Sequence, residues 1–250
     1  PYYFRVCFLD PFQGSVMANF AKDEFGAGNA YVLSMLGEDY GSGLATYFVN
    51  AFEELGGTVT AESFPEGTAN FVSYVNNAKS AGAGVIFCPV SINYAQLIVE
   101  AAAAQGFEGS LLGSDTLDSN MVLEAASGSD VKLYVSTFYQ EGVNAEFDSA
   151  IKEWINSDAT AKTNNGGDDK LSAVTVMGYD VYCVALEAIK AADSTDPAAV
   201  LAALPGVTYE GITGTISFND IGDANRDSAV VKKCNTESGN WDFVTVAKVG

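Results

Sequence analysis

Strand-like and helix-like segments alternate through the first half of the chain. Four strands are predicted, at 29–36, 58–64, 85–89 and 109–113, and the first of them is rich in apolar residues and is predicted to be buried. A helix is predicted after each of them, at 42–55, from Asn70 onward, at 94–105 and at 121–126. The strands begin about every 25 to 28 residues, which is the spacing of βαβ units. This repeat predicts a parallel, Rossmann-like sheet covered by helices on both faces.

A sheet of this kind binds ligands beyond the carboxyl ends of its strands. Three turns of the predicted sheet lie there, at 38–43, 89–93 and 114–118, and we interpret them as one functional rim. The glycines of the first turn read G-x-G-x-x-T, and no lysine follows them. The pattern is therefore neither a dinucleotide fingerprint nor a phosphate-binding loop.

The charge of the chain and its lack of histidine exclude several classes of function. Acidic residues outnumber basic ones by 32 to 12, the formal net charge is −20, and histidine is absent. A polyanion of this strength repels phosphate backbones, so nucleic acid is not an expected partner. Without histidine, a Ser-His-Asp triad, a Cys-His pair and an HExxH zinc site are all excluded. We predict a protein that is not an enzyme and that uses no cofactor or metal.

Helices follow one another between residues 145 and 205, with no strand of ordinary length among them. They are predicted at 145–157, 171–192 and 197–204, with a polar loop at 158–170. The first carries large apolar side chains at helical spacing, including Trp154 and Ile155, and such a face has to be buried. These helices either form a small bundle or cover a sheet whose strands lie outside this chain. Strand character returns at 213–218, 229–234 and 243–249.

Short motifs spread over nearly the whole chain resemble one family of binding proteins. They are FRV at 4–6, DPFQG at 10–14, DYGSG at 39–43, the ESF-to-Phe stretch at 62–71, GSD at 113–115, GYD at 178–180, EAI at 187–189, GITG at 211–214, FND at 218–220 and GD at 222–223. Each motif is weak alone, but their order is specific. Together they resemble the branched-chain amino acid binding proteins, which are type I periplasmic solute-binding components of ABC importers.

The resemblance implies two α/β lobes, joined by three crossover strands, that close about a hinge around a ligand in the cleft between them. It divides the chain into a first crossover at 1–10, a complete second lobe at 11–131, a second crossover at 132–139, a remnant of the first lobe at 140–208, and a third crossover with C-terminal strands at 209–250. Relatives carry the strands of the first lobe before the first crossover. The resemblance thus implies that the N-terminal half of the first lobe is absent here, and that another segment or chain supplies its sheet.

Three rim residues are candidates for binding the ligand. Asp115 ends the fourth predicted strand, and the resemblance assigns it to the ammonium group of an amino acid; the alternative is a loop aspartate that caps the following turn. Tyr40 matches a ligand-facing tyrosine of the family, although its ring could equally cover the core. Ser91 matches a third position in the cleft, and its neighbours Val90 and Asn93 remain alternatives.

Asp10, Phe12 and Gln13 lie at the first crossover and are candidates for lining the cleft. Their alternative role is to shape the hinge and, for Asp10, to cap a helix that begins near Gly14.

The resemblance implies an extracytoplasmic protein, in the periplasm or lipid-anchored at the cell surface, with any signal segment outside this chain. It would capture an amino acid or similar small molecule and deliver it to a membrane ABC permease. The alternative is a ligand-sensing domain of the same fold coupled to a receptor. A permease gene beside this one would favour transport, and a signalling module would favour sensing. An enzyme that uses Asp115 with a lysine or tyrosine is a third, weaker hypothesis.

Overall fold

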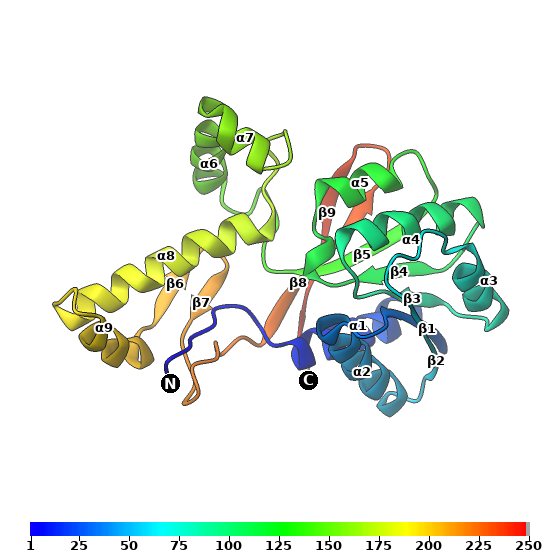
Figure 1. Cartoon of the computed structure of the whole chain (residues 1–250), viewed down its shortest axis with the longest axis horizontal. Helices are drawn as coiled ribbons and strands as arrows, with labels where there is room; N and C mark the ends of the chain where they lie inside the picture. The colour runs from blue at the N-terminus through cyan, green and yellow to red at the C-terminus, as the bar shows by residue number, and fades with distance from the viewer. Residues whose placement is uncertain (249–250) are drawn as a thin grey trace. The chain divides into compact units, whose positions relative to one another are not determined.

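The computed structural model describes residues 1–248, which divide into two compact units (Figure 1). One unit comprises residues 1–9 and 138–227, and the other comprises residues 10–137 and the chain from Ser228 onward. The last predicted strand, at 243–249, ends at Val249, which lies outside the described residues.

A seven-stranded sheet forms the centre of the larger unit. Its strands follow the order β2 (Thr58–Phe64), β1 (Asn29–Met35), β3 (Val85–Phe87), β4 (Ser110–Gly113), β5 (Lys132–Thr137), β8 (Ser228–Asn235) and β9 (Asn240–Lys248). The first five are parallel, whereas β8 pairs antiparallel with β5, and β9 antiparallel with β8. The predicted α/β fold with a mostly parallel sheet is confirmed.

Alternate side chains of the strands enter two separate cores, because successive Cβ atoms point to opposite faces of a sheet. Tyr31 and Leu33 of β1 belong to the core formed with α3 (Val72–Ser80), α4 (Ile92–Ala104) and α5 (Asn120–Ala126). Ala30 and Val32 belong to the core formed with α1 (Asp10–Phe25) and α2 (Asp39–Glu54). Helices thus cover both faces of the sheet, which leaves the strand ends for function.

Helix α1 packs closely against α2 because Gly14 has no side chain. A Cβ at this position would lie 2.7 Å from Tyr47 Cβ and 2.9 Å from Phe48 N. The helix begins at Asp10, earlier than the start near Gly14 that the sequence indicates. Asp10 therefore stands in the first turn, where a carboxylate interacts favourably with the positive end of the helix dipole.

The smaller unit consists of helices and one short hairpin. Its elements are α6 (Ala145–Ser157), α7 (Ala159–Asn164), α8 (Ala173–Ala192), α9 (Pro197–Ala203), the 3-10 turn η2 (Leu204–Gly206), β6 (Tyr209–Gly211) and β7 (Gly214–Ile216). Two expectations were wrong here. Helix α7 forms inside the predicted polar loop, and the strand predicted at 213–218 is the shorter β7, which pairs with the unpredicted β6.

A buried carboxylate on α8 organises the turn of this hairpin. Asp180 accepts hydrogen bonds from the backbone N–H groups of Ile212 at 2.9 Å and Thr213 at 2.8 Å. Arg226 donates to the carbonyl and the hydroxyl of Thr213, both at 2.7 Å, and also to the carbonyl of Val6. The network therefore fastens the N-terminal segment, the hairpin and the chain around residue 226 within this unit.

One face of α8 is apolar and exposed in this unit. Val174, Val181, Tyr182 and Leu186 fall on it at helical spacing, with exposed fractions of 74%, 46%, 63% and 36%. The opposite face is buried through residues such as Val184 and Ala188. On α6, Ile155 is buried as predicted, whereas Trp154, which was also predicted to be buried, is exposed within residues 1–248.

None of the helices among residues 1–248 combines the length and the apolarity that crossing a bilayer requires.

Candidate functional site

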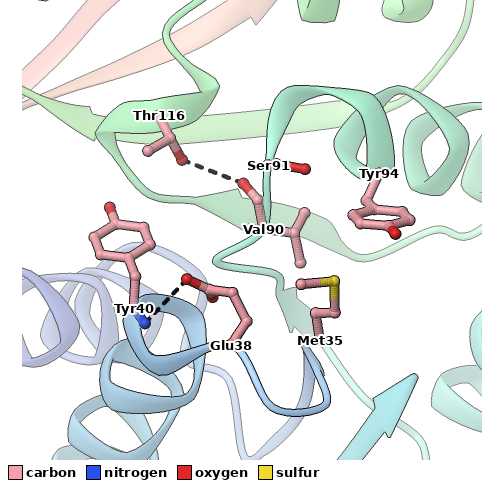
Figure 2. Close-up of a pocket in the computed structure, with 7 residues that line it drawn as sticks. All are labelled: Met35, Glu38, Tyr40, Val90, Ser91, Tyr94 and Thr116. Atoms are coloured by element: carbon pink, nitrogen blue, oxygen red, sulfur yellow. Dashed lines mark hydrogen bonds between the residues drawn. The ribbon is translucent and has the colours of Figure 1, made fainter. Parts of the chain in front are cut away.

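The carboxyl ends of β1, β3 and β4 bring three turns together in the larger unit, as expected for parallel strands. The turn after β1 carries Glu38 and leads into Tyr40 on α2. The turn after β3 carries Val90 and Ser91, and that after β4 continues into the 3-10 turn η1 (Asp115–Leu117). Figure 2 shows how side chains from these turns surround one pocket.

Asp115 is held through only one of its two carboxylate oxygens. Its Oδ1 accepts hydrogen bonds from the Tyr40 hydroxyl at 2.8 Å and from Gln13 Nε2 at 2.9 Å. Among residues 1–248, no hydrogen bond to Oδ2 accompanies them. The side chain is half-buried. One oxygen thus fixes the orientation of the carboxylate, and the other remains able to accept a donor from a ligand.

Tyr40 serves this carboxylate as a permanent hydrogen-bond donor. Burial of the ring raises the pKa of Tyr40 above its ordinary value, and the negative charge of Asp115 raises it further. Asp10 adds to the same effect, which places its charge near the hydroxyl. The phenol therefore keeps its proton at physiological pH and donates it towards Asp115.

Gln13 connects α1 to the strand ends. Its side chain is 1% exposed, and Nε2 donates to both Asp115 Oδ1 and Ser136 Oγ, the latter at 3.0 Å at the end of β5. Of the three crossover candidates, the structure brings only Gln13 into contact with Asp115. Phe12 is half-buried on α1 and does not line the pocket.

A cavity of about 150 Å³ lies beside Tyr40. Its lining residues are Met35, Glu38, Tyr40, Val90, Ser91, Tyr94 and Thr116. The sequence places five of these seven on the predicted rim, but it misses Met35 and Tyr94. Met35 belongs to the end of a strand and Tyr94 to the first turn of a helix, so neither stands out as a turn residue. Asn93, an alternative to Ser91, is exposed and outside the lining.

Glu38, Thr116 and Tyr94 in the wall of this cavity have hydrogen-bond partners in the protein, whereas Ser91 makes no side-chain capping bond to its helix. Glu38 is the N-cap of α2, and its carboxylate accepts from the N–H groups of Tyr40 at 3.0 Å and Gly41 at 2.5 Å. Thr116 Oγ1 donates to the carbonyl of Val90 at 3.2 Å. Tyr94 Oη accepts from the N–H of Gly67 at 2.9 Å. These contacts make the wall rigid and leave its surface mainly apolar.

Within residues 1–248, no three histidine, cysteine, aspartate or glutamate side chains gather as a metal site would require.

Replacing Gln13 by leucine is expected to weaken about tenfold the binding of a ligand that donates a hydrogen bond to Asp115, because Asp115 Oδ1 loses a donor worth roughly 1.5 kcal/mol and the carboxylate gains rotational freedom. The dissociation constant measured by isothermal titration calorimetry checks this. Unchanged affinity in a variant that unfolds at the wild-type temperature would show that Gln13 does not orient Asp115.

Comparison with known proteins shows the family to which the chain belongs. A profile of the family described as periplasmic binding protein matches residues 1–237. This chain belongs to the periplasmic binding protein family. Its fold is type I, and within that fold it groups with the Leu/Ile/Val-binding proteins, as the motifs predicted.

Two curated relatives illustrate the distance within the family. The leucine-, isoleucine-, valine-, threonine- and alanine-binding protein of Pseudomonas aeruginosa is 23% identical over 222 residues, which are 88% of this chain and 57% of that protein. A Leu/Ile/Val-binding protein homolog of Brucella abortus is 26% identical over 211 residues, which cover 83% of this chain and 52% of that protein. The chain thus spans about half the length of the curated relatives it matches.

Solved periplasmic binding proteins share the fold over nearly all of this chain. A leucine-binding protein of Thermotoga maritima is 31% identical, with a TM-score of 0.81 over 98% of this chain and 67% of that chain. A branched-chain amino acid transporter substrate-binding protein of Streptococcus pneumoniae, solved with isoleucine, is 20% identical with a TM-score of 0.74, over 98% of this chain and 67% of its own. In both proteins, about a third of the chain has no counterpart here.

Proposed function

We propose that this chain forms the ligand-binding part of an extracytoplasmic protein that captures an α-amino acid, closes around it and passes it to a membrane ABC permease. Membership of the periplasmic binding protein family supports a solute-binding role. Asp115 supports the proposal that the solute is an α-amino acid, because Tyr40 and Gln13 hold one of its carboxylate oxygens and the other can accept a hydrogen bond from the ligand. An ammonium group can donate a charge-assisted hydrogen bond to such an oxygen.

The experiment that tests this function is a titration of the protein, as its gene encodes it, with the twenty amino acids and with sugars and carboxylic acids. Isothermal titration calorimetry is expected to detect binding of α-amino acids and no binding of the other solutes. Tight binding of a solute that has no ammonium group, with no amino acid bound, would contradict the proposal.

We also propose that the apolar face of α8 packs against a sheet of the first lobe, supplied by another segment or chain. The four exposed side chains of α8 form a continuous stripe, which water-exposed helices rarely carry. The solved leucine-binding protein, of which this chain covers 67%, supports the proposal because it contains additional chain.

Covering this face should protect a cysteine placed on it. In the Tyr182→Cys variant of the protein as its gene encodes it, a maleimide reagent is expected to label the new thiol at least about tenfold more slowly than it labels Thr208→Cys, at an exposed position of the same unit. Labelling of both thiols at the same rate would show that the face is uncovered.

A further inference from the structure

The cavity beside Tyr40 has the features of a subsite for the ligand's side chain. Two of its lining residues are directly linked to Asp115: the hydroxyl of Tyr40 donates to the Asp115 carboxylate, and Thr116 follows Asp115 in η1. An α-amino acid carries its side chain on the same carbon as its ammonium group. A ligand bound through Asp115 can therefore place its side chain in this cavity.

The size of the cavity limits the side chain that fits. Its volume is about 150 Å³. A protein cavity of roughly that volume, lined by apolar side chains, binds benzene. A phenyl ring therefore fills this cavity, whereas the methyl group of alanine leaves most of it empty.

The chemistry of the wall favours an uncharged aromatic ring. Glu38 and Thr116 are already hydrogen-bonded within the protein. A ligand therefore meets mainly the side chains of Tyr40, Tyr94, Val90 and Met35, with Ser91 as the remaining polar group of the lining (Figure 2). Aromatic rings contact one another favourably in edge-to-face and offset geometries, and a thioether contacts a ring edge favourably. An acidic side chain would face the like charge of the Glu38 carboxylate, and a basic one would lose water to pair with a carboxylate that already accepts two backbone hydrogen bonds.

We propose that this cavity is the side-chain subsite of the binding site and that it selects α-amino acids with an aromatic side chain, phenylalanine above all. The proposal rests on the proposed function, because it takes the ammonium group to be bound at Asp115. Every residue that lines this cavity belongs to the larger unit.

Calorimetric titration of the protein as its gene encodes it, with phenylalanine, leucine, alanine and lysine, tests this proposal. We expect phenylalanine to bind at least about 100-fold more tightly than alanine and more tightly than leucine or lysine, since a well-filled apolar pocket discriminates about 10- to 200-fold per missing methylene. Alanine binding with an affinity equal to that of phenylalanine would overturn the subsite and leave the proposed function intact. If no amino acid binds, the proposed function fails and the subsite fails with it.

Two variants locate the subsite. Ser91→Phe narrows the cavity from its rim, so it should reduce the affinity for phenylalanine at least about tenfold more than the affinity for alanine. Ala104→Phe adds the same ring to an exposed position at the other end of α4 and should change neither affinity. Met35→Ala enlarges the cavity and should shift the preference from phenylalanine towards tryptophan. Equal losses for alanine and phenylalanine in Ser91→Phe, or no shift in Met35→Ala, would overturn the assignment.

Discussion

Replacing Asp115 by alanine is expected to weaken amino acid binding by about 2–5 kcal/mol, which corresponds to roughly 30-fold to several thousand-fold in the dissociation constant. The loss is large because the ammonium group would enter a partly buried site with no anion to receive it. Calorimetry with the best-binding amino acid of the panel measures this loss directly.

The same substitution should have little effect on folding. Tyr40 Oη lies 3.5 Å from Gln13 Oε1, so the two side chains freed by the substitution can pair with each other. Asp115→Asn is the closer variant, because it keeps the shape of the side chain and the acceptor for Tyr40 and removes only the charge. Asp39→Asn, at an exposed position in the first turn of α2, removes one negative charge nearby and should leave binding unchanged. Wild-type affinity in Asp115→Ala would exclude Asp115 from the ammonium site.

Replacing Lys232 by methionine is expected to lower the free energy of unfolding by about 3–5 kcal/mol, since it leaves a buried carboxylate without its counter-ion. Lys232 Nζ lies 3.1 Å from Asp118 Oδ1 and 3.0 Å from Oδ2, and both side chains are 2% exposed. Thr137 donates to the same carboxylate at 2.8 Å. The pair therefore joins β8 and the end of β5 to the residue that follows η1, the turn that carries Asp115.

Urea unfolding followed by circular dichroism measures this effect. Lys233→Met removes the neighbouring charge at an exposed position and should cost less than about 1 kcal/mol. The double variant Lys232→Met with Asp118→Leu should regain at least half of the lost stability, because it leaves no unpaired charge in the interior. Equal stability of Lys232→Met and Lys233→Met would show that the buried pair does not hold these segments together.

The sheet of the larger unit could be predicted because its pattern is local. The predicted strand at 58–64 coincides with β2, and the predicted helix at 145–157 coincides with α6, because apolar spacing and capping residues lie within each segment. The carboxyl ends of parallel strands lie at one edge of the sheet. The order of the elements therefore also predicted that Tyr40, Ser91 and the turn of Asp115 lie close together.

The burial of Lys232 could not be predicted, because its partner is distant in the sequence. Val231 and Cys234 belong to the cores on opposite faces of the sheet, so ordinary alternation places Lys232 on the covered face that Cys234 shares. A lysine on a covered face needs a counter-ion, and Asp118 lies 114 residues away in the chain. No local pattern joins the two residues.

Two short elements escaped prediction for different reasons. Helix α7 has no apolar spacing, but it does have a capping residue, because Asp158 accepts from the N–H groups of Thr160 and Ala161. That aspartate was the available signal. Strand β6 is three residues long and forms only by pairing with β7, next to the buried Asp180 that holds their turn. Tertiary contacts of this kind leave no periodic pattern in a sequence.

The measurement that tests the central claim most directly compares an amino acid with its 2-hydroxy analogue. The best-binding amino acid of the panel and the acid in which a hydroxyl replaces its ammonium group have nearly the same shape but differ in charge. The protein as its gene encodes it should bind the hydroxy acid at least about 100-fold more weakly, and Asp115→Ala should remove most of that difference. Equal affinity of the wild-type protein for the two compounds would contradict recognition of an ammonium group at Asp115.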